Sequence, residues 1–431
     1  TVEGANNGED LEMCATIVYG DKLVKAVKDG LVPEDRIDEA CIRLIRTIMA
    51  FEEAYTANYG EEVIGCEQHA VLALKSAQEG ITLLKNEGGI LPLSRDEAKT
   101  IAVIGKLAQA PNIGDYGSSR VYPKHVVTPL EGIGKAAPLS KVIFDDGSNL
   151  EQTKKIAADA DVVVFVVGFD HDDEGEYVAN ESADNYTESV GGDRKTLDLH
   201  ADEIALLKAV GPANKNAIAV MIGGNTTMIT EWMDKVGAII MAYYPGQEGG
   251  TALAQILFGD INPSGKLPYV QPRAETDLPK LNWDTTNQWY DYYHGYAKLE
   301  KEGVEPLYPY GYGLSYTSFK VENAAFRAQN GEVGASCTVS NTGSRTGSEV
   351  VQLYVGFRNS VVDRPVKLLR GFTRVELKPG ESRKITLSCP VSKLEWYNPQ
   401  KPGFELEHME YQVYIGTSSA DQDLLQGEVS L

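Results

Sequence analysis

The sequence has 431 residues, of which 42% are hydrophobic, and this length suffices for two to four globular domains with cores of their own. Its formal net charge of -22 opposes binding to nucleic-acid phosphates and to anionic membrane surfaces, so neither is an expected partner. The five cysteines are scattered and odd in number, so the sequence predicts no disulfide framework and no structural metal site.

The first residues of the sequence predict neither a signal peptide nor a membrane span. TVEGANNGEDLEM is polar and lacks the basic, apolar and small-residue order of a signal peptide, and no run of 18 apolar residues occurs in the sequence. We expect an internal start. The compartment therefore stays open, with extracellular and periplasmic locations both compatible.

Two helical patterns follow. Pro33 opens an amphipathic helix in which Ile37, Leu44 and Ile48 recur at helical spacing, and a second helical pattern covers residues 69–86. Two helices without a sheet cannot make a core, so we expect them to pack on another element or chain. We assign residues 1–57 to the first segment and residues 58–98 to a linker of helix and strand.

Residues 99–316 alternate short apolar runs with helical patterns. The runs are rich in β-branched residues and are not relieved by polar alternation, as is typical of strands covered on both faces. They begin at Ile101, Lys141, Val162, Ala217 and Ala238. The predicted fold class is α/β, with a largely parallel sheet in an α/β sandwich.

Residues 317–431 predict a second domain made of antiparallel strands. Short alternating segments at 348–357, 382–389 and 411–416 are separated by turns such as the one at 378–381. This pattern is typical of a small β-sandwich of the immunoglobulin or fibronectin type III kind.

The loop after the strand at 162–168 carries the main candidate chemistry. Its first residues, FDHDDEGEY, include five carboxylates: Asp170, Asp172, Asp173, Glu174 and Glu176. Ligands of open α/β sheets gather at the carboxyl ends of strands, and clustered carboxylates can raise one pKa into the range of a proton donor. A solvated acidic loop or an adventitious calcium site would explain the same residues without catalysis.

Two other segments have both a functional and a structural interpretation. The glycine-rich loop at 114–123, GDYGSSRVYP, matches no nucleotide-binding motif, so a sugar contact or a structural turn is favoured there. The aromatic cluster NQWYDYYHGY at 287–296 could stack on a pyranose ring, but packing is the favoured interpretation. The six histidines form no catalytic or metal-binding motif.

Several motifs occur in the order found in glycoside hydrolase family 3, and the resemblance covers nearly the whole chain. The segment ANNGEDLEM resembles the stretch downstream of that family's catalytic aspartate, and VSNTGSRTGSEVVQLYV resembles its fibronectin-like domain. EGITLLKNEGGILPL resembles the family's interdomain stretch, and LRGFTRVELKPGES also resembles its fibronectin-like domain. Its most recognisable motifs are close to YYPGQEGGTALAQILFGDINPSGKLP and YPYGYGLSYTSF.

The resemblance implies retaining hydrolysis of β-linked glucosides or gluco-oligosaccharides. In that family a barrel aspartate is the nucleophile and a glutamate from the α/β sandwich is the acid/base. Glu174, which precedes Gly175 as in the family's Glu-Gly pair, is the first choice for the acid/base, and Glu176 is its competitor. Asp115 and Arg120 resemble residues that border the sugar site, where a salt bridge is an equal alternative. No metal, nucleotide or redox cofactor is implied.

The family's nucleophile segment, Ser-Asp-Trp, does not occur in this sequence. The resemblance therefore implies that residues 1–57 are a remnant of the barrel domain, and that a missing barrel segment or a second chain supplies the nucleophile. A homodimer is also compatible with the sequence. The alternatives are a β-xylosidase or other exo-β-glycosidase, and a catalytically incomplete carbohydrate-binding or interaction fragment.

Overall fold

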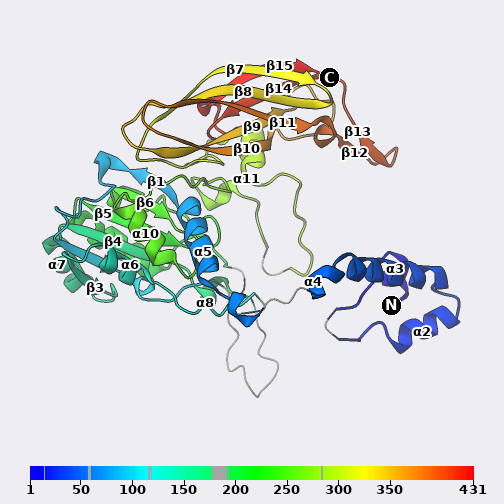
Figure 1. Cartoon of the computed structure of the whole chain (residues 1–431), viewed down its shortest axis with the longest axis horizontal. Helices are drawn as coiled ribbons and strands as arrows, with labels where there is room; N and C mark the ends of the chain where they lie inside the picture. Colours follow the sequence, from blue (N-terminus) through cyan, green and yellow to red (C-terminus); the bar gives the residue numbers. More distant parts are fainter. Residues whose placement is uncertain are drawn as a thin grey trace. The chain divides into compact units, whose positions relative to one another are not determined.

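A computed structural model describes residues 1–13, 15–56, 60–114, 117, 119–176, 192, 194–282 and 285–431. The chain divides into two compact units, Thr1–Cys66 and Glu67–Leu431 (Figure 1). Among the described residues, no helix combines the length and the apolar character that crossing a bilayer requires.

The N-terminal unit is helical and buries little apolar surface. Its helices are α1 (Val2–Asn6), α2 (Asp21–Lys28), α3 (Glu34–Ala50), α4 (Glu52–Thr56) and the 3-10 turn η1 (Glu61–Val63). The carboxylate of Asp10 pairs with Arg36 and Arg43 of α3, with N–O distances of 2.6 Å in both cases. The helix predicted after Pro33 is confirmed, but its Ile45 and Ile48 are exposed. This unit therefore leaves part of its apolar helix face uncovered.

A six-stranded sheet forms the centre of the first part of the second unit. The strands are β1 (Thr82–Asn86), β2 (Thr100–Ile104), β3 (Lys141–Asp145), β4 (Val162–Gly168), β5 (Ala217–Ile222) and β6 (Ala238–Met241). Their order is β1-β6-β5-β4-β2-β3, and every neighbouring pair is parallel except β1 with β6. The predicted, largely parallel sheet is confirmed.

Helices cover both faces of this sheet (Figure 1). One face packs against α5 (Glu67–Gly80), α6 (Pro129–Ala136) and α10 (Gly249–Leu257), and the other against α7 (Leu150–Asp159) and α9 (Ala201–Val210). Two further helices are α8 (His171–Glu174) and α11 (Gly295–Glu302). The 3-10 turns among the described residues of this unit are η2 (Glu87–Gly89), η3 (Lys106–Ala108), η4 (Gly211–Ala213), η5 (Met233–Lys235), η6 (Glu275–Asp277), η7 (Val391–Leu394) and η8 (Asp421–Asp423). Because both faces are covered, the strands could be recognised as continuous apolar runs.

The second predicted helix is wrong in its last part. Helix α5 ends at Gly80, and residues 82–86 form β1 at the edge of the sheet. Leu83 packs into the core on one face and Leu84 into the core on the other, which is the alternation of a strand. Lys85 is buried here and donates hydrogen bonds to the carbonyls of Met233 and Val236, which offsets the cost of burying its charge.

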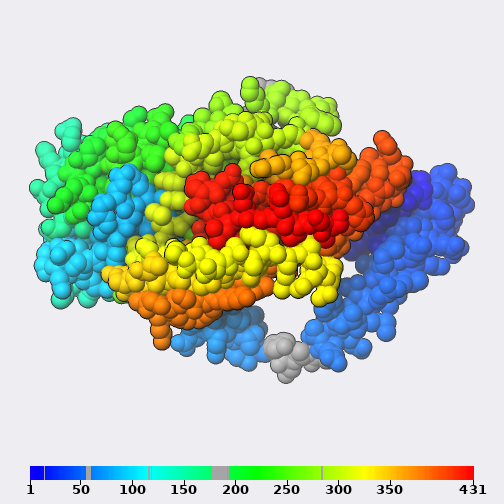
Figure 2. Space-filling model, turned by 90° about the horizontal axis from the view of Figure 1, so that it is seen from above, coloured from blue at the N-terminus to red at the C-terminus, as the bar shows by residue number. Residues whose placement is uncertain are grey.

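The second part of the unit is an antiparallel β-sandwich, as predicted. One sheet has the order β10-β9-β14-β15 and the other β11-β8-β7, beside a two-stranded hairpin. Figure 2 shows β15 (red) next to β7 (yellow), so strands from the two sheets meet along one side. The strands are β7 (Phe319–Gln329), β8 (Glu332–Asn341), β9 (Gly347–Gly356), β10 (Lys367–Leu377), β11 (Ser382–Pro390), β12 (Trp396–Asn398), β13 (Gly403–Glu405), β14 (Glu410–Gly416) and β15 (Leu424–Ser430).

The aromatic cluster at 287–296 is only partly packed. Tyr293 is buried, but Trp289, Tyr290 and Tyr292 are exposed, and Trp289 keeps 87% of its surface accessible. The expectation that packing accounts for this cluster is therefore wrong for three of its rings. Aromatic density alone did not reveal which rings face solvent.

Candidate active site

The acidic loop begins where β4 ends, at the carboxyl edge of the sheet. Gly168, the last residue of β4, has φ of +132°, and a Cβ there would lie 1.9 Å from the carbonyl oxygen of Ile222. Only glycine fits this close approach of β4 to the end of β5. The residues after Gly168 therefore emerge directly beside the loop that follows β5.

Aspartates hold the first turn of this loop. Asp170 caps α8, since its side chain accepts a hydrogen bond from the amide of Asp172 at 2.9 Å. The side chain of Asp173 accepts one from the amide of Asp170 at 3.2 Å, which completes a capping box. These two carboxylates stabilise the turn that carries Glu174.

The carboxylate of Glu174 points into the protein, where three groups surround it. Its Oε1 lies 2.7 Å from Nε of Arg194, an ion pair whose geometry is not that of a hydrogen bond. Its Oε2 accepts hydrogen bonds from the amide of Gly224 at 2.7 Å and from the hydroxyl of Tyr244 at 2.6 Å. We call these four residues the Glu174 cluster. Only 13% of the Glu174 side chain and 9% of the Arg194 side chain are exposed.

The partners in this cluster are themselves fixed. The guanidinium of Arg194 lies 3.8 Å above the ring of Phe169 and donates hydrogen bonds to the side chain of Asn225 and the carbonyl of Thr226. Burial raises the pKa of Tyr244 far above its usual value, and the hydrogen bond to Glu174 raises it further. Tyr244 therefore stays a neutral donor to the carboxylate.

A second group lies next to α8 and contains another inward carboxylate. Nε2 of His200 is 3.1 Å from Asp173, and Glu203 accepts a hydrogen bond from the amide of Gly168 at 3.0 Å. Burial raises the pKa of Glu203 from 4.5 to about 7. Burial lowers the pKa of His200, but the nearby carboxylates, Asp173 first, raise it above its usual value. We call Asp173, His200 and Glu203 the Glu203 cluster.

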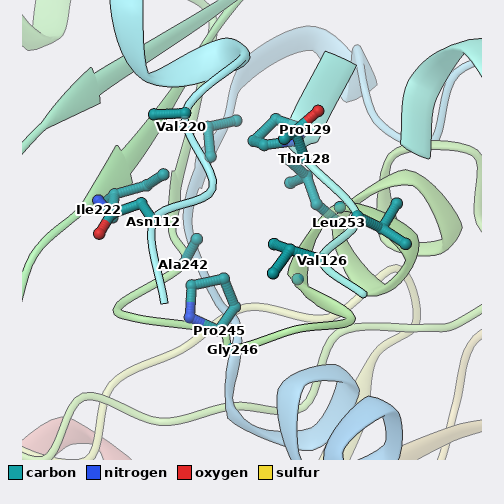
Figure 3. A pocket seen from close by; sticks show the side chains of 14 residues that line it. Asn112, Val126, Thr128, Pro129, Val220, Ile222, Ala242, Pro245, Gly246 and Leu253 are labelled. Atoms are coloured by element: carbon teal, nitrogen blue, oxygen red, sulfur yellow. The ribbon is translucent and has the colours of Figure 1, made fainter. Parts of the chain in front are cut away.

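Residues that the structure describes line two cavities at the carboxyl edge. One, of about 520 Å³, opens beyond the ends of β2, β3 and β4 and includes Glu203 in its wall, at the point where the strand order reverses. The other holds about 20 Å³, which is room for one water molecule. Figure 3 shows its apolar wall, with Val220 and Ile222 of β5 on one side and Pro129 and Leu253 on the other. Only the first cavity can admit a ring-sized ligand.

The predicted site residues have different surroundings. Glu176 is exposed, two residues after the inward Glu174. Arg120 is exposed, and its guanidinium lies 4.9 Å from the centre of the Tyr122 ring. Asp115 lies outside the described residues. The role of Asp115 and Arg120 in sugar binding stays a prediction, as does the role of Glu176 in catalysis.

Sequence reasoning missed the partners of Glu174. Arg194 is the last residue of the segment GGDR at 191–194, and Tyr244 lies in the motif that begins YYPGQEGG. The sequence could not show that Arg194 and Tyr244, which lie 20 and 70 positions after Glu174, contact its carboxylate. Gly224 contributes only its backbone amide, for which no side-chain signal exists.

One group of metal-type ligands occurs among the described residues. Ligand atoms of Asp170, His171 and Asp172 lie within 4.8 Å of one another at this edge. Asp170 already caps α8, and Asp172 is exposed. This arrangement has too few inward donors to indicate a resident metal.

Comparison with known proteins identifies the family. The profile of the glycosyl hydrolase family 3 C-terminal domain matches residues 81–316, and that of the fibronectin type III-like domain matches residues 349–419. The chain belongs to glycosyl hydrolase family 3. The family resemblance inferred from the sequence motifs is thereby confirmed.

Relatives and solved structures agree with this assignment. The chain is 34% identical to thermostable beta-glucosidase B of Acetivibrio thermocellus, over 97% of this chain and 56% of that protein. It is 33% identical to a beta-xylosidase of Formosa agariphila, over 84% of this chain and 50% of that protein. The crystal structure of a GH3 beta-glucosidase from Bifidobacterium adolescentis superimposes with a TM-score of 0.85 at 30% identity, covering 100% of this chain and 63% of that one. The chain thus spans little more than half the length of the relatives it matches.

Proposed function

We propose that this chain is the C-terminal part of a retaining β-glucosidase-like hydrolase acting on β-linked gluco-oligosaccharides, and that Glu176 is its general acid/base. The observation that carries this choice is the inward position of Glu174, whose two oxygens already face Arg194, Gly224 and Tyr244. A general acid must reach the leaving-group oxygen. Glu176 lies two residues further along the same loop and is exposed.

In this proposal Glu174 is a positioning residue. Its ion pair with Arg194 lies within the connection between β4 and α9. Its hydrogen bonds tie this connection to the loops after β5 and β6, and so help to set the position of residue 176. Glu176 then donates its proton to the glycosidic oxygen as the bond breaks, and it later takes a proton from the attacking water. Retention needs a second carboxylate about 5–5.5 Å away, on the opposite side of the scissile bond.

We further propose that this second carboxylate comes from outside the chain, from a missing barrel segment or a second chain. The support is the absence of the Ser-Asp-Trp motif from this sequence and the greater length of the relatives. The uncovered apolar residues Ile45 and Ile48 of α3 are consistent with such a neighbour. If the chain remains inactive when mixed with a barrel fragment of the family, it is a binding or interaction fragment instead.

The test compares two substitutions in the complete enzyme. Glu176→Gln is expected to lower turnover of cellobiose about 100-fold or more and turnover of an activated aryl β-glucoside far less, because an activated leaving group needs little protonation. Glu174→Gln is expected to lower both activities to a similar extent, together with the melting temperature. If the dependence on the leaving group appears at Glu174 and not at Glu176, the assignment is reversed.

The relative named beta-xylosidase supports a second candidate activity, exo-β-xylosidase. Both substrates use the same two-carboxylate chemistry and differ in the C6 hydroxymethyl group. A matched pair of aryl β-glucoside and aryl β-xyloside separates them by the ratio of kcat/KM values, and a ratio in favour of the xyloside would replace the glucosidase proposal.

A further inference from the structure

A separate cavity lies between the segment 295–309 and the β-sandwich, within the unit Glu67–Leu431. Its volume is about 340 Å³, and α11, the loop after it, β10 and β14 form its walls. Pockets that bind small molecules measure about 300–1,000 Å³, so this one suits a small ligand. It shares no lining residue with the Glu174 cluster. We call it the α11 cavity.

Glu300 lines this cavity and carries a buried acceptor just beneath its wall. Its Oε1 pairs with Nζ of Lys367 at 2.8 Å, but its buried Oε2 accepts no hydrogen bond from any residue that the structure describes. Lys367 is only 4% exposed and also pairs with Asp421 at 3.1 Å. Native proteins rarely leave a buried carboxylate oxygen without a donor. Because Oε2 has almost no accessible surface, a ligand hydroxyl reaches it only when the carboxylate turns toward the cavity.

The charges around the cavity balance. Three cations and three carboxylates line it, so no excess charge selects an anion or a cation. These residues are Arg273, Glu300, Glu305, Arg358, Lys367 and Asp421. Donors and acceptors therefore stand side by side, and hydroxyl groups can satisfy both because each hydroxyl donates once and accepts twice.

The rest of the lining is aromatic and aliphatic. Tyr296 and Tyr414 contribute rings, and Leu299 and Val366 contribute aliphatic surface. The ring of Tyr296 packs against that of Tyr310, with 4.8 Å between the ring centroids. The hydroxyl of Tyr296 accepts a hydrogen bond from the amide of Leu369. Rigid rings beside alternating donors and acceptors suit a molecule with both apolar C–H faces and hydroxyl groups.

We propose that the α11 cavity binds a neutral mono- or disaccharide, as a carbohydrate site distinct from the catalytic edge. In this site the carboxylate of Glu300 turns so that Oε2 accepts a sugar hydroxyl, Arg358 and Gln422 bind other hydroxyls, and a tyrosine ring covers a C–H face of the pyranose. The site would hold product or substrate close to the enzyme without taking part in bond cleavage.

The experiment is binding of glucose and cellobiose to the purified chain, by calorimetry and by saturation-transfer NMR, with glucuronate and phosphate as anionic probes. We expect dissociation constants on the order of 1 mM for the neutral sugars and no binding of the anions. Ala420→Phe, which fills the cavity, should abolish sugar binding, and Glu300→Gln should weaken it about fivefold to tenfold. Glu302→Gln, on the same helix outside the lining, is the matched control and should bind as the unsubstituted chain does.

Each outcome bears on the α11 cavity independently of the proposed catalysis. Glu176→Gln should leave this binding unchanged, so a loss with Glu176→Gln and not with Ala420→Phe would place the sugar at the catalytic edge and overturn the inference. Preference for glucuronate or phosphate would overturn the ligand class. Absence of sugar binding by a folded chain, judged by an unchanged melting temperature in every variant, would overturn the site itself.

Discussion

Two inward carboxylates stand at the same edge of the sheet, yet their surroundings differ. Glu174 has a guanidinium at 2.7 Å and two hydrogen-bond donors. Glu203 receives one backbone amide, and its other oxygen is buried without a hydrogen-bond donor among the described residues. Burial raises the pKa of Glu203 to about 7. The comparison teaches that two inward carboxylates at one edge differ in charge compensation, since a guanidinium faces Glu174 while Glu203 receives one backbone amide.

The largest effect is expected when the Glu174 cluster loses its cation. Arg194→Leu leaves a buried carboxylate without its counter-charge and should lower the free energy of unfolding by about 3–5 kcal/mol. Chemical denaturation measures this. The double variant Arg194→Leu with Glu174→Gln should lose less than the single variant, because no unpaired charge remains. Arg273→Leu, an exposed arginine, is the control, and an equal loss there would contradict the special role of Arg194.

The next prediction concerns the pH dependence of the Glu203 cluster. Because the folded pKa of Glu203 is raised from 4.5 to about 7, the folded state holds the proton more tightly. Its contribution to stability is complete below pH 4.5 and is lost as the pH rises through 7. Glu203→Gln keeps an acceptor for the Gly168 amide and carries no charge. It should leave stability unchanged near pH 4.5 and raise it by about 2–3 kcal/mol at pH 8.

The control for this pH effect is Asp202→Asn. Burial raises the pKa of Asp202, but the contact with Lys106 lowers it below its usual value. Asp202→Asn should therefore give no gain at pH 8. Thermal unfolding at both pH values measures both variants, and an equal gain for Glu203→Gln at pH 4.5 and pH 8 would refute the assigned titration.

The smallest effect is expected when the Glu174 cluster loses one donor and keeps its cation. Tyr244→Phe removes the hydroxyl that donates to Glu174 at 2.6 Å and should cost about 1–2 kcal/mol in the free energy of unfolding. Tyr290→Phe, at an exposed ring, should cost nothing measurable. If Tyr244→Phe lowers the free energy of unfolding as much as Arg194→Leu does, the hydroxyl contributes as much as the cation to stabilising the Glu174 carboxylate.

The sequence predicted most of the second unit because its signals are local. The strands of the α/β sandwich are continuous apolar runs covered on both faces, and those of the β-sandwich alternate, so both could be read from short windows. Strand β1 was missed because Leu83 and Leu84 continue the apolar spacing of α5. Only pairing with β6, far along the chain, makes this stretch a strand.

The sequence predicted which loop carries the candidate site, but it did not predict which residues contact Glu174. The acidic loop and the two glutamates stand out in the sequence, whereas the inward turn of Glu174 depends on Arg194, Gly224 and Tyr244, which the fold brings together. The proposal that Glu176 is the acid/base rests on these contacts. The Glu-Gly pair, on which the first choice of Glu174 is based, gives no information about these contacts.

Strand β1 also determines where the polypeptide can be cut. It pairs with β6 and, through Leu83, forms a bridge to Leu314, so residues 82–86 tie the sheet to the segment that leads into the β-sandwich. A protease acting just before Glu67 would release a body that keeps all six strands. A cut within residues 87–98 would break the covalent link between β1 and β2, and β1 would then be held in the sheet by its pairing with β6 and its bridge to Leu314.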